Sequence, residues 1–300
     1  MTNSDADFDT LLLLFRRASS LPELPGNALR IVHLIDSGSA SARDLERIIC
    51  SDPGLSANLL RVSNARVSGE SVHGGISTIR AAILRLGQRS VRTVAVSLIV
   101  QHIANGRDIA SEFNVDRFAR HSLYVAFLSR YLFARRNLAH PFESRWTADE
   151  IFAGGLLHDI GLALLARVMK ESYFRVHSFA SRTGTTLDGS FQRIYGKPIN
   201  ELACTAVEAW DLPELFSLTL KSVNEPWRCK PEYTAMCCIS YANYLAQMKE
   251  AKTEDWLTAP ALLPEVEEEI ALPVDEIDRV LASVEDQVNA YLDQKDNLAA

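Results

Sequence analysis

The residues best suited to chemistry are the adjacent His158 and Asp159, which lie in the apolar stretch GGLLHDIG at residues 154–161. An unpaired buried charge is costly, so two ionisable side chains in such a stretch are expected to have partners. Successive residues of a helix point about 100° apart. An imidazole nitrogen and a carboxylate oxygen from this pair could therefore bind one metal ion only if the ion lay between the two directions.

The elements that must position this pair are predicted to be helices. Apolar residues recur at helical spacing almost throughout, and no sustained apolar–polar alternation indicates a strand, so the sequence predicts an all-α fold. The segment Asn105–Asp108 is the best candidate for a boundary between an N-terminal helical lobe, residues 1–107, and a second helical lobe, residues 108–300, that ends in an acidic helix. Helices are expected near residues 6–18, 26–36, 41–49, 53–64, 77–86, 89–102, 116–135, 146–169 with a bend near Gly161, 170–182, 187–195, 200–210, 231–250 and 274–294.

The composition limits the classes of partner and compartment. The net charge is −7, and residues 254–300 alone contribute −11, which leaves about +4 for the rest of the chain. This balance argues against nucleic-acid binding, which requires a basic surface. No apolar run is expected to span a membrane, and an acidic start does not fit a secretory signal. Five cysteines without a C-x-x-C spacing indicate buried thiols in a reducing compartment, so we expect a cytoplasmic protein.

Several motifs, in order along the chain, together resemble the HDOD (HD-related output domain) family over roughly residues 20–250. They are Leu21–Pro25 (LPELP), Asp52–Asn64 (DPGLSANLLRVSN), the segment Ile79–Gly87 (IRAAILRLG), His121–Ala126 (HSLYVA) and Leu156–Gly161 (LLHDIG). The resemblance implies an all-helical bacterial signalling protein. In it, an N-terminal helical bundle lobe would pack on a lobe like that of the HD phosphohydrolases.

The same resemblance assigns His121, His158 and Asp159 as metal ligands. Other ligand positions of the catalytic relatives are changed here. Lys197–Ile199 stands where a histidine is expected, the segment Val223–Asn224 replaces a His-His pair, and Asn243 replaces a late aspartate. A site closed by an amide, without ligands for a second metal, is poorly suited to phosphoester hydrolysis. We therefore expect a vestigial, unoccupied metal site and no cofactor, with the three residues forming a buried hydrogen-bonded cluster.

Three functions remain open. The preferred one is a non-catalytic regulatory module that binds signalling proteins such as response regulators or cyclic-dinucleotide enzymes in the groove between the lobes. The second is a phosphohydrolase that uses a single divalent metal at His121, His158 and Asp159. The third is a nucleotide sensor at an arginine face, formed by Arg85, Arg89 and Arg92 with Arg80 and Arg61 nearby. Solvated arginines, some of them paired with the acidic tail, are the favoured explanation of that face.

Overall fold

The computed structural model describes residues 3–17, 21–64, 76–106, 108–251 and 261–299. These residues form helices and no strand, which confirms the predicted all-α fold. In chain order the elements are α1 (Asn3–Arg17), α2 (Gly26–Asp36), α3 (Ala42–Cys50), α4 (Pro53–Asn64), α5 (Ile79–Ala104), α6 (Val115–Ala139), α7 (Ala148–Leu157), α8 (Ile160–Val168), α9 (Lys170–Thr183), α10 (Leu187–Tyr195), α11 (Ile199–Ala209), α12 (Glu214–Ser222), the 3₁₀ helices η1 (Pro226–Arg228) and η2 (Lys230–Glu232), α13 (Tyr233–Ala251), α14 (Pro264–Ile270) and α15 (Val274–Ala299).

Helix starts in the N-terminal bundle follow local capping chemistry. The Asp52 carboxylate accepts a hydrogen bond from the backbone N–H of Leu55 at 3.1 Å, while Pro53 occupies the first position of α4. Two helices were expected at residues 77–86 and 89–102. The structure joins them as α5, with a kink at Gly87, whose φ of 77° is a left-handed conformation that favours glycine.

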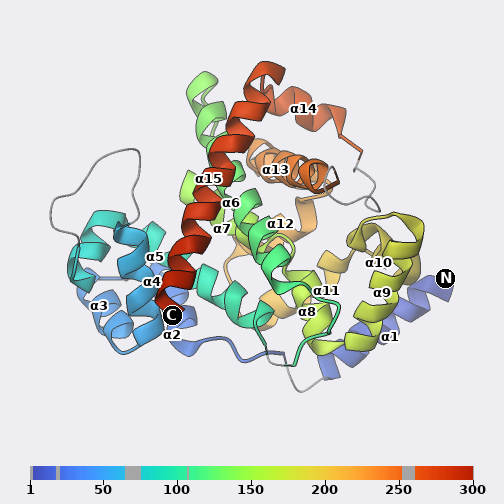
Figure 1. Ribbon diagram of the computed structural model, residues 1–300, viewed down its shortest axis with the longest axis horizontal. Coiled ribbons are helices and arrows are strands. Elements are labelled where there is room, and N and C mark those ends of the chain that lie inside the picture. Colours follow the sequence, from blue (N-terminus) through green and yellow to red (C-terminus); the bar gives the residue numbers. More distant parts are fainter. Residues whose placement is uncertain (1–2, 18–20, 65–75, 107, 252–260, 300) are drawn as a thin grey trace.

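The centre of the molecule is the packing of α6 on α7 and α13 (Figure 1). The segment Ala148–Val168, which includes α7 and α8, is apolar and long enough to cross a membrane, but 78% of its most apolar window is buried inside the protein. Its apolarity therefore fits a core position. The bend predicted near Gly161 is present. The helix breaks at Asp159, two residues before this glycine, where φ is −110° and ψ is 16°.

Both ends of the chain contact distant parts of the fold. Helix α1 packs on α10 and α11, and the long α15 runs across α6 towards α4 (Figure 1). At its far end, the Arg61 guanidinium donates to the backbone oxygen of Tyr291 at 3.1 Å and lies 4.1 Å from the centre of its ring. Residue 107, the expected boundary between lobes, lies outside the described residues. The N- and C-terminal helices nevertheless each join segments from the two sides of that position.

A buried arginine links three of these helices. The side chain of Arg92 in α5 is only 6% exposed and lies between Asp36 of α2 and Glu150 of α7. Its Nε is 3.0 Å from Asp36 Oδ1, and its Nη1 donates to Glu150 Oε1 at 3.1 Å. Burial raises the pKa of Asp36, Arg92 opposes this increase, and Glu150 adds to it. The arginine therefore holds two carboxylates together that would otherwise repel each other.

Replacing Arg92 with methionine should lower the free energy of unfolding by about 2–3 kcal/mol, somewhat less than the loss of a fully buried pair because both carboxylates are partly exposed. Urea unfolding measures the change. Arg89→Met, an exposed position in the same helix, is the matched control and should change stability by less than about 0.5 kcal/mol. Equal effects of the two substitutions would contradict a structural role for the Arg92 ion pairs.

Candidate metal centre

The break between α7 and α8 brings the sequence-predicted residues together. His121 projects from α6, His158 follows the last residue of α7, and Asp159 is the non-helical residue before α8. Helices α6 and α7 approach closely at Gly155 of α7, where an added Cβ would lie 3.0 Å from the Cα of Ala126 in α6. A side chain at this position would force the helices apart. The glycine therefore sets the distance between His121 and the His-Asp pair.

The three side chains meet through one atom each. His121 Nε2 lies 3.3 Å from His158 Nε2 and 3.5 Å from Asp159 Oδ2, and His158 Nε2 lies 3.4 Å from the same oxygen. His158 is completely buried, and His121 is 8% exposed. Among the described residues, this trio is the group of His, Cys, Asp and Glu side chains that could hold a metal ion.

The opposite nitrogens of both rings are also bound, and this fixes their protonation. His158 Nδ1 lies 2.7 Å from the backbone oxygen of Gly155, which can only accept, so this nitrogen carries a proton. His121 Nδ1 lies 2.7 Å from Glu250 Oε1 and likewise donates to a carboxylate. In the neutral rings, both Nε2 atoms would then present lone pairs to each other and to Asp159. A cation must lie among the three atoms, either a proton on one imidazole or a metal ion.

The surrounding charges favour a cation at this point. Burial disfavours the imidazolium of His121, but the carboxylates of Glu250 and then Asp159 outweigh burial and raise its pKa. Burial also opposes ionisation of Asp159, yet His158 and then His121 lower the pKa of that carboxyl to about 2. Glu250 behaves in the same way, because His121 and Arg117 outweigh burial and lower its pKa. Two ionised carboxylates thus flank the histidines.

The donor set also fits one divalent metal. Ligands about 2.1 Å from a tetrahedral ion lie roughly 3.4 Å apart, close to the separations of the three atoms here. Hydrogen bonds from the second ring nitrogens to Glu250 and Gly155 are the usual way in which proteins orient metal-binding histidines. The trio could therefore supply three ligands and leave other positions of the ion open.

The positions that depart from the catalytic pattern have other partners. The Asp188 carboxylate, near the start of α10, accepts from the backbone N–H of Ile199 at 3.2 Å and from Asn224 Nδ2 at 3.0 Å. Asn243 Oδ1 accepts from Gln247 Nε2 at 3.1 Å. Ile199, Asn224 and Asn243, in the segments where the resemblance implies metal ligands, therefore each have a hydrogen-bond partner within the protein.

Sequence reasoning missed Glu250 and Asp188. Glu250 is an acidic residue near the end of α13, and Asp188 resembles an ordinary first-turn residue of a helix. Burial raises the pKa of Asp188 to about 6, Asp159 adds to the increase, and the donors Ile199 and Asn224 partly offset it. Only the tertiary fold places these carboxylates near the histidines. The residues next to Glu250 and Asp188 in the sequence do not indicate that these carboxylates lie near the histidines.

The arginine face does not form a single site. Arg92 is buried between carboxylates, Arg80 pairs with Glu46 at 2.8 Å, and Arg61 binds the backbone of α15. Arg85 and Arg89 are exposed and lie on opposite sides of the kink at Gly87. The arginines are thus mostly paired or solvated, and they do not provide a convergent phosphate site.

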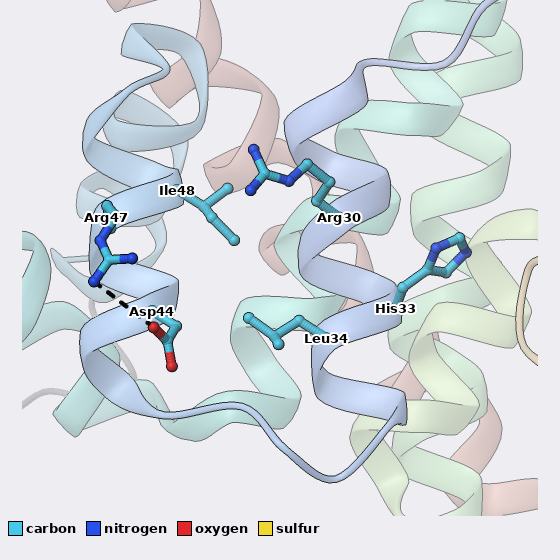
Figure 2. A pocket seen from close by; sticks show the side chains of 6 residues that line it. All are labelled: Arg30, His33, Leu34, Asp44, Arg47 and Ile48. Atoms are coloured by element: carbon cyan, nitrogen blue, oxygen red, sulfur yellow. Dashed lines mark ion pairs between the residues drawn. The ribbon is translucent and has the colours of Figure 1, made fainter.

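A separate open cleft lies between α2 and α3 (Figure 2). Its volume is about 440 Å³, and the apolar side chains of Leu34 and Ile48 approach each other across it. The guanidinium groups of Arg30 and Arg47 stand at its edge, and Arg47 is 3.9 Å from Asp44. Arg30 has no hydrogen-bond or ion-pair partner in the described part of the chain. The cleft therefore combines an apolar floor with an available positive charge.

Removing the charge of Glu250 should lower the pKa of His121, because the carboxylate is the main group that raises it. Nitrogen-detected NMR titration of Glu250→Gln in a chelator-treated sample measures this pKa directly. Glu208→Gln, at an exposed position in α11, should leave it unchanged. An identical His121 pKa in the wild type and in Glu250→Gln would refute the electrostatic description of the cluster.

Asp188 should make stability depend on pH. Its folded pKa of about 6 lies above its ordinary value of 3.8, so its favourable contribution is complete below about pH 4 and is lost as the pH rises through 6. Between pH 4 and 7, the wild type should lose up to about 3 kcal/mol relative to Asp188→Asn. Urea unfolding across this range, with Asp116→Asn as an exposed control, tests the difference. Parallel pH profiles for wild type and Asp188→Asn would contradict it.

Comparisons with known proteins agree with this architecture. Among solved structures, the fold is similar to an HDOD domain protein of unknown function from Geobacter sulfurreducens, with 19% identity, a TM-score of 0.66 and coverage of 95% of this chain and 94% of the other. It is also similar to a Shewanella amazonensis SB2B protein provisionally named a phosphohydrolase, with 19% identity, a TM-score of 0.69 and coverage of 94% and 97%. A Marinobacter aquaeolei VT8 protein, provisionally named a signal transduction protein, has 20% identity, a TM-score of 0.72 and coverage of 98% and 66%.

These similarities establish the fold. They do not assign an activity, because proteins with identities near 20% can share a fold and differ in function. None of the curated protein sequences matches the chain. The HDOD domain family matches residues 21–226, which include α2 to α5, the His-Asp break, Asp188 in α10 and Asn224 after α12. The chain therefore belongs to the HDOD domain family.

Proposed function

We propose that this HDOD protein is a non-catalytic regulatory module that acts by binding a signalling protein. The proposal rests on the residues at the positions where the family resemblance implies further metal ligands, because these residues are neutral amides paired with other side chains. Asn243 is paired with Gln247, and Asn224 is paired with Asp188. Among the described residues, three potential ligands converge, enough for one cation. Two metal ions that clamp both the attacking and the leaving oxygen of a phosphoester would require more ligands.

The cluster itself supports a structural role. A proton on His121 alone would satisfy the lone pairs of His158 and Asp159, because His121 already donates its other ring proton to Glu250. Buried polar groups that are fully paired stabilise one arrangement of the core without any chemistry. We infer that the cluster joins α6, α7 and α13, and that it is either protonated or holds a single metal ion.

The cleft between α2 and α3 is the favoured docking place for the partner. The two-lobed organisation expected from the sequence favours a groove between the lobes, and no observation tests that groove. The cleft lies between α2 and α3, where Leu34 and Ile48 offer apolar contact and Arg30 offers a charge without a partner in the described part of the chain. Buried apolar anchors beside an arginine are typical of energetically important interface positions. Response regulators and cyclic-dinucleotide enzymes remain the classes of partner that we propose.

A single-metal phosphohydrolase is the second candidate, favoured by the convergence of His121, His158 and Asp159 within reach of one ion. These three residues would hold the metal, which would supply a positive charge to polarise a phosphoryl oxygen. Glu250 and the backbone of Gly155 would orient the two imidazoles. This candidate requires turnover that depends on the trio.

Measurement of activity and metal content separates the two candidates. The purified chain, supplied with Mn²⁺ or Mg²⁺, should hydrolyse cyclic dinucleotides, nucleotides and p-nitrophenyl phosphate no faster than its Asp159→Ala variant. Elemental mass spectrometry of both proteins reports whether a metal binds at the trio. Metal-dependent turnover in the wild type that disappears in Asp159→Ala, without loss of folding, would establish the enzyme and refute the non-catalytic proposal.

The docking site is tested with charge-reversal variants on α2 and α3. Arg30→Glu combined with Arg47→Glu should weaken binding of a signalling partner, identified by affinity capture with the wild type, by about tenfold or more. Arg43→Glu changes an exposed charge on α3 outside the cleft and is the matched control, while Asp159→Ala should bind like the wild type. Unchanged binding by the double variant would exclude the cleft as the docking place.

A further inference from the structure

A second cavity lies where the catalytic pattern is lost. It has a volume of about 140 Å³ and is formed by α13, the segment after α12 and the residues that lead into α14. Its polar lining consists of Asn224, Ser240, Asn243, Tyr244 and Gln247, and aliphatic side chains complete the wall. None of the charged side chains that the structure describes lines it. The family resemblance implies metal ligands at Asn224 and Asn243, so neutral amides line the cavity at two positions where ligands would be expected.

The amides of this pocket have hydrogen-bonding capacity left over. Asn243 is 6% exposed and uses Oδ1 to accept from Gln247. Within the described residues, its Nδ2 donor and the Oε1 acceptor of Gln247 have no hydrogen-bond partner. Asn224 donates through Nδ2 to Asp188, which leaves its Oδ1 as an acceptor. These atoms keep contact with solvent, so either water or a ligand can pair with them.

The pocket also offers an aromatic surface. Tyr244 lines it and is itself stacked on Tyr241, with ring centres 5.9 Å apart and an angle of 19° between the planes. A neighbouring donor and acceptor on Asn243 and Gln247 match the edge of a planar ring that carries both an acceptor and a donor. An aromatic side chain next to such a pair favours flat heterocycles over flexible chains.

We propose that this cavity binds an uncharged planar heterocycle with adjacent hydrogen-bond donors and acceptors, the chemical class of the nucleobases. A phosphate group would gain nothing in the cavity, because no cation among the described residues lines it and Asn224 at its wall donates to the Asp188 carboxylate. The ligand is therefore a free base or a nucleoside, recognised through its base. This site is independent of the proposed partner-binding cleft.

Binding is tested on the full chain with adenine, hypoxanthine, cytosine, uracil and their nucleosides, by ligand-observed NMR followed by calorimetry. At least one base should bind, and its 5′-monophosphate should bind no more tightly than the nucleoside. Asn243→Leu and Gln247→Leu should each weaken binding by about tenfold, the effect of one lost hydrogen bond and its unpaired partner. Thermal unfolding confirms that each variant is folded, and Gln247→Leu, at a less buried position, carries the test if Asn243→Leu does not fold.

Two controls locate the effect. Gln192→Leu, at an exposed position in α10, and the Arg30→Glu, Arg47→Glu double variant should bind the base like the wild type. Absence of binding by every base and nucleoside, or equal binding by wild type and both leucine variants, would overturn the inference. Binding that requires the phosphate would also overturn it, because the ligand would then be recognised as an anion. None of these outcomes would affect the test of partner binding.

Discussion

The close approach of α6 and α7 at Gly155 is the constraint on which the site depends. A Cβ atom at Gly155 would lie only 3.0 Å from the Cα of Ala126, closer than a normal contact. The backbone oxygen of Gly155 also accepts a hydrogen bond from Nδ1 of His158 and so orients that ring. The same approach places His121 of α6 across from that ring, with the two Nε2 atoms 3.3 Å apart. A larger residue would separate the helices and would also misplace an acceptor. Gly155 thus determines both how closely α6 and α7 pack and how the ring of His158 is oriented.

This packing creates an electrostatic requirement. The atoms brought together are all acceptors when the rings are neutral, and they lie in the low-dielectric core, where unpaired polar groups are costly. Glu250, near the C-terminal end of α13, meets this requirement in part. Its ionised carboxylate accepts a hydrogen bond from His121 Nδ1 and stabilises a positive charge on that ring. Either a proton or a metal ion meets the requirement. The His-Asp motif can therefore serve as a structural element, whichever cation it holds.

The sequence predicts the helices well where the signals are local. Asp52 and Pro53 mark the start of α4, and apolar spacing predicts α2 from Gly26 to Asp36. Helices α12 and α14 needed the tertiary structure, because they are too short to give a clear period. The sequence predicts a bend near Gly161 but does not fix the break at Asp159, because apolar residues continue at helical spacing on both sides of it.

The same distinction applies to the site and its surroundings. The resemblance to HDOD proteins assigned His121, His158 and Asp159, and the structure shows that they meet. Glu250 is 129 positions from His121, so the contact between them depends on how α13 packs on α6. Arg92 was read as part of a solvated basic face, yet its environment is two carboxylates from other helices. Spacing along one helix cannot report charges that other helices contribute.

The hydrogen bonds of Asn224 bear on its substitution by histidine, the residue that the family resemblance implies at this position. Asn224 now pairs with Asp188, and the backbone of Ile199 pairs with the other oxygen of the same carboxylate. Asp188 already has a raised pKa because it is buried near Asp159. A histidine at position 224 would remove the amide that donates to the Asp188 carboxylate at 3.0 Å. The neutral amides are therefore coupled to the buried acids, and restoring a metal ligand would require several of these positions to change together.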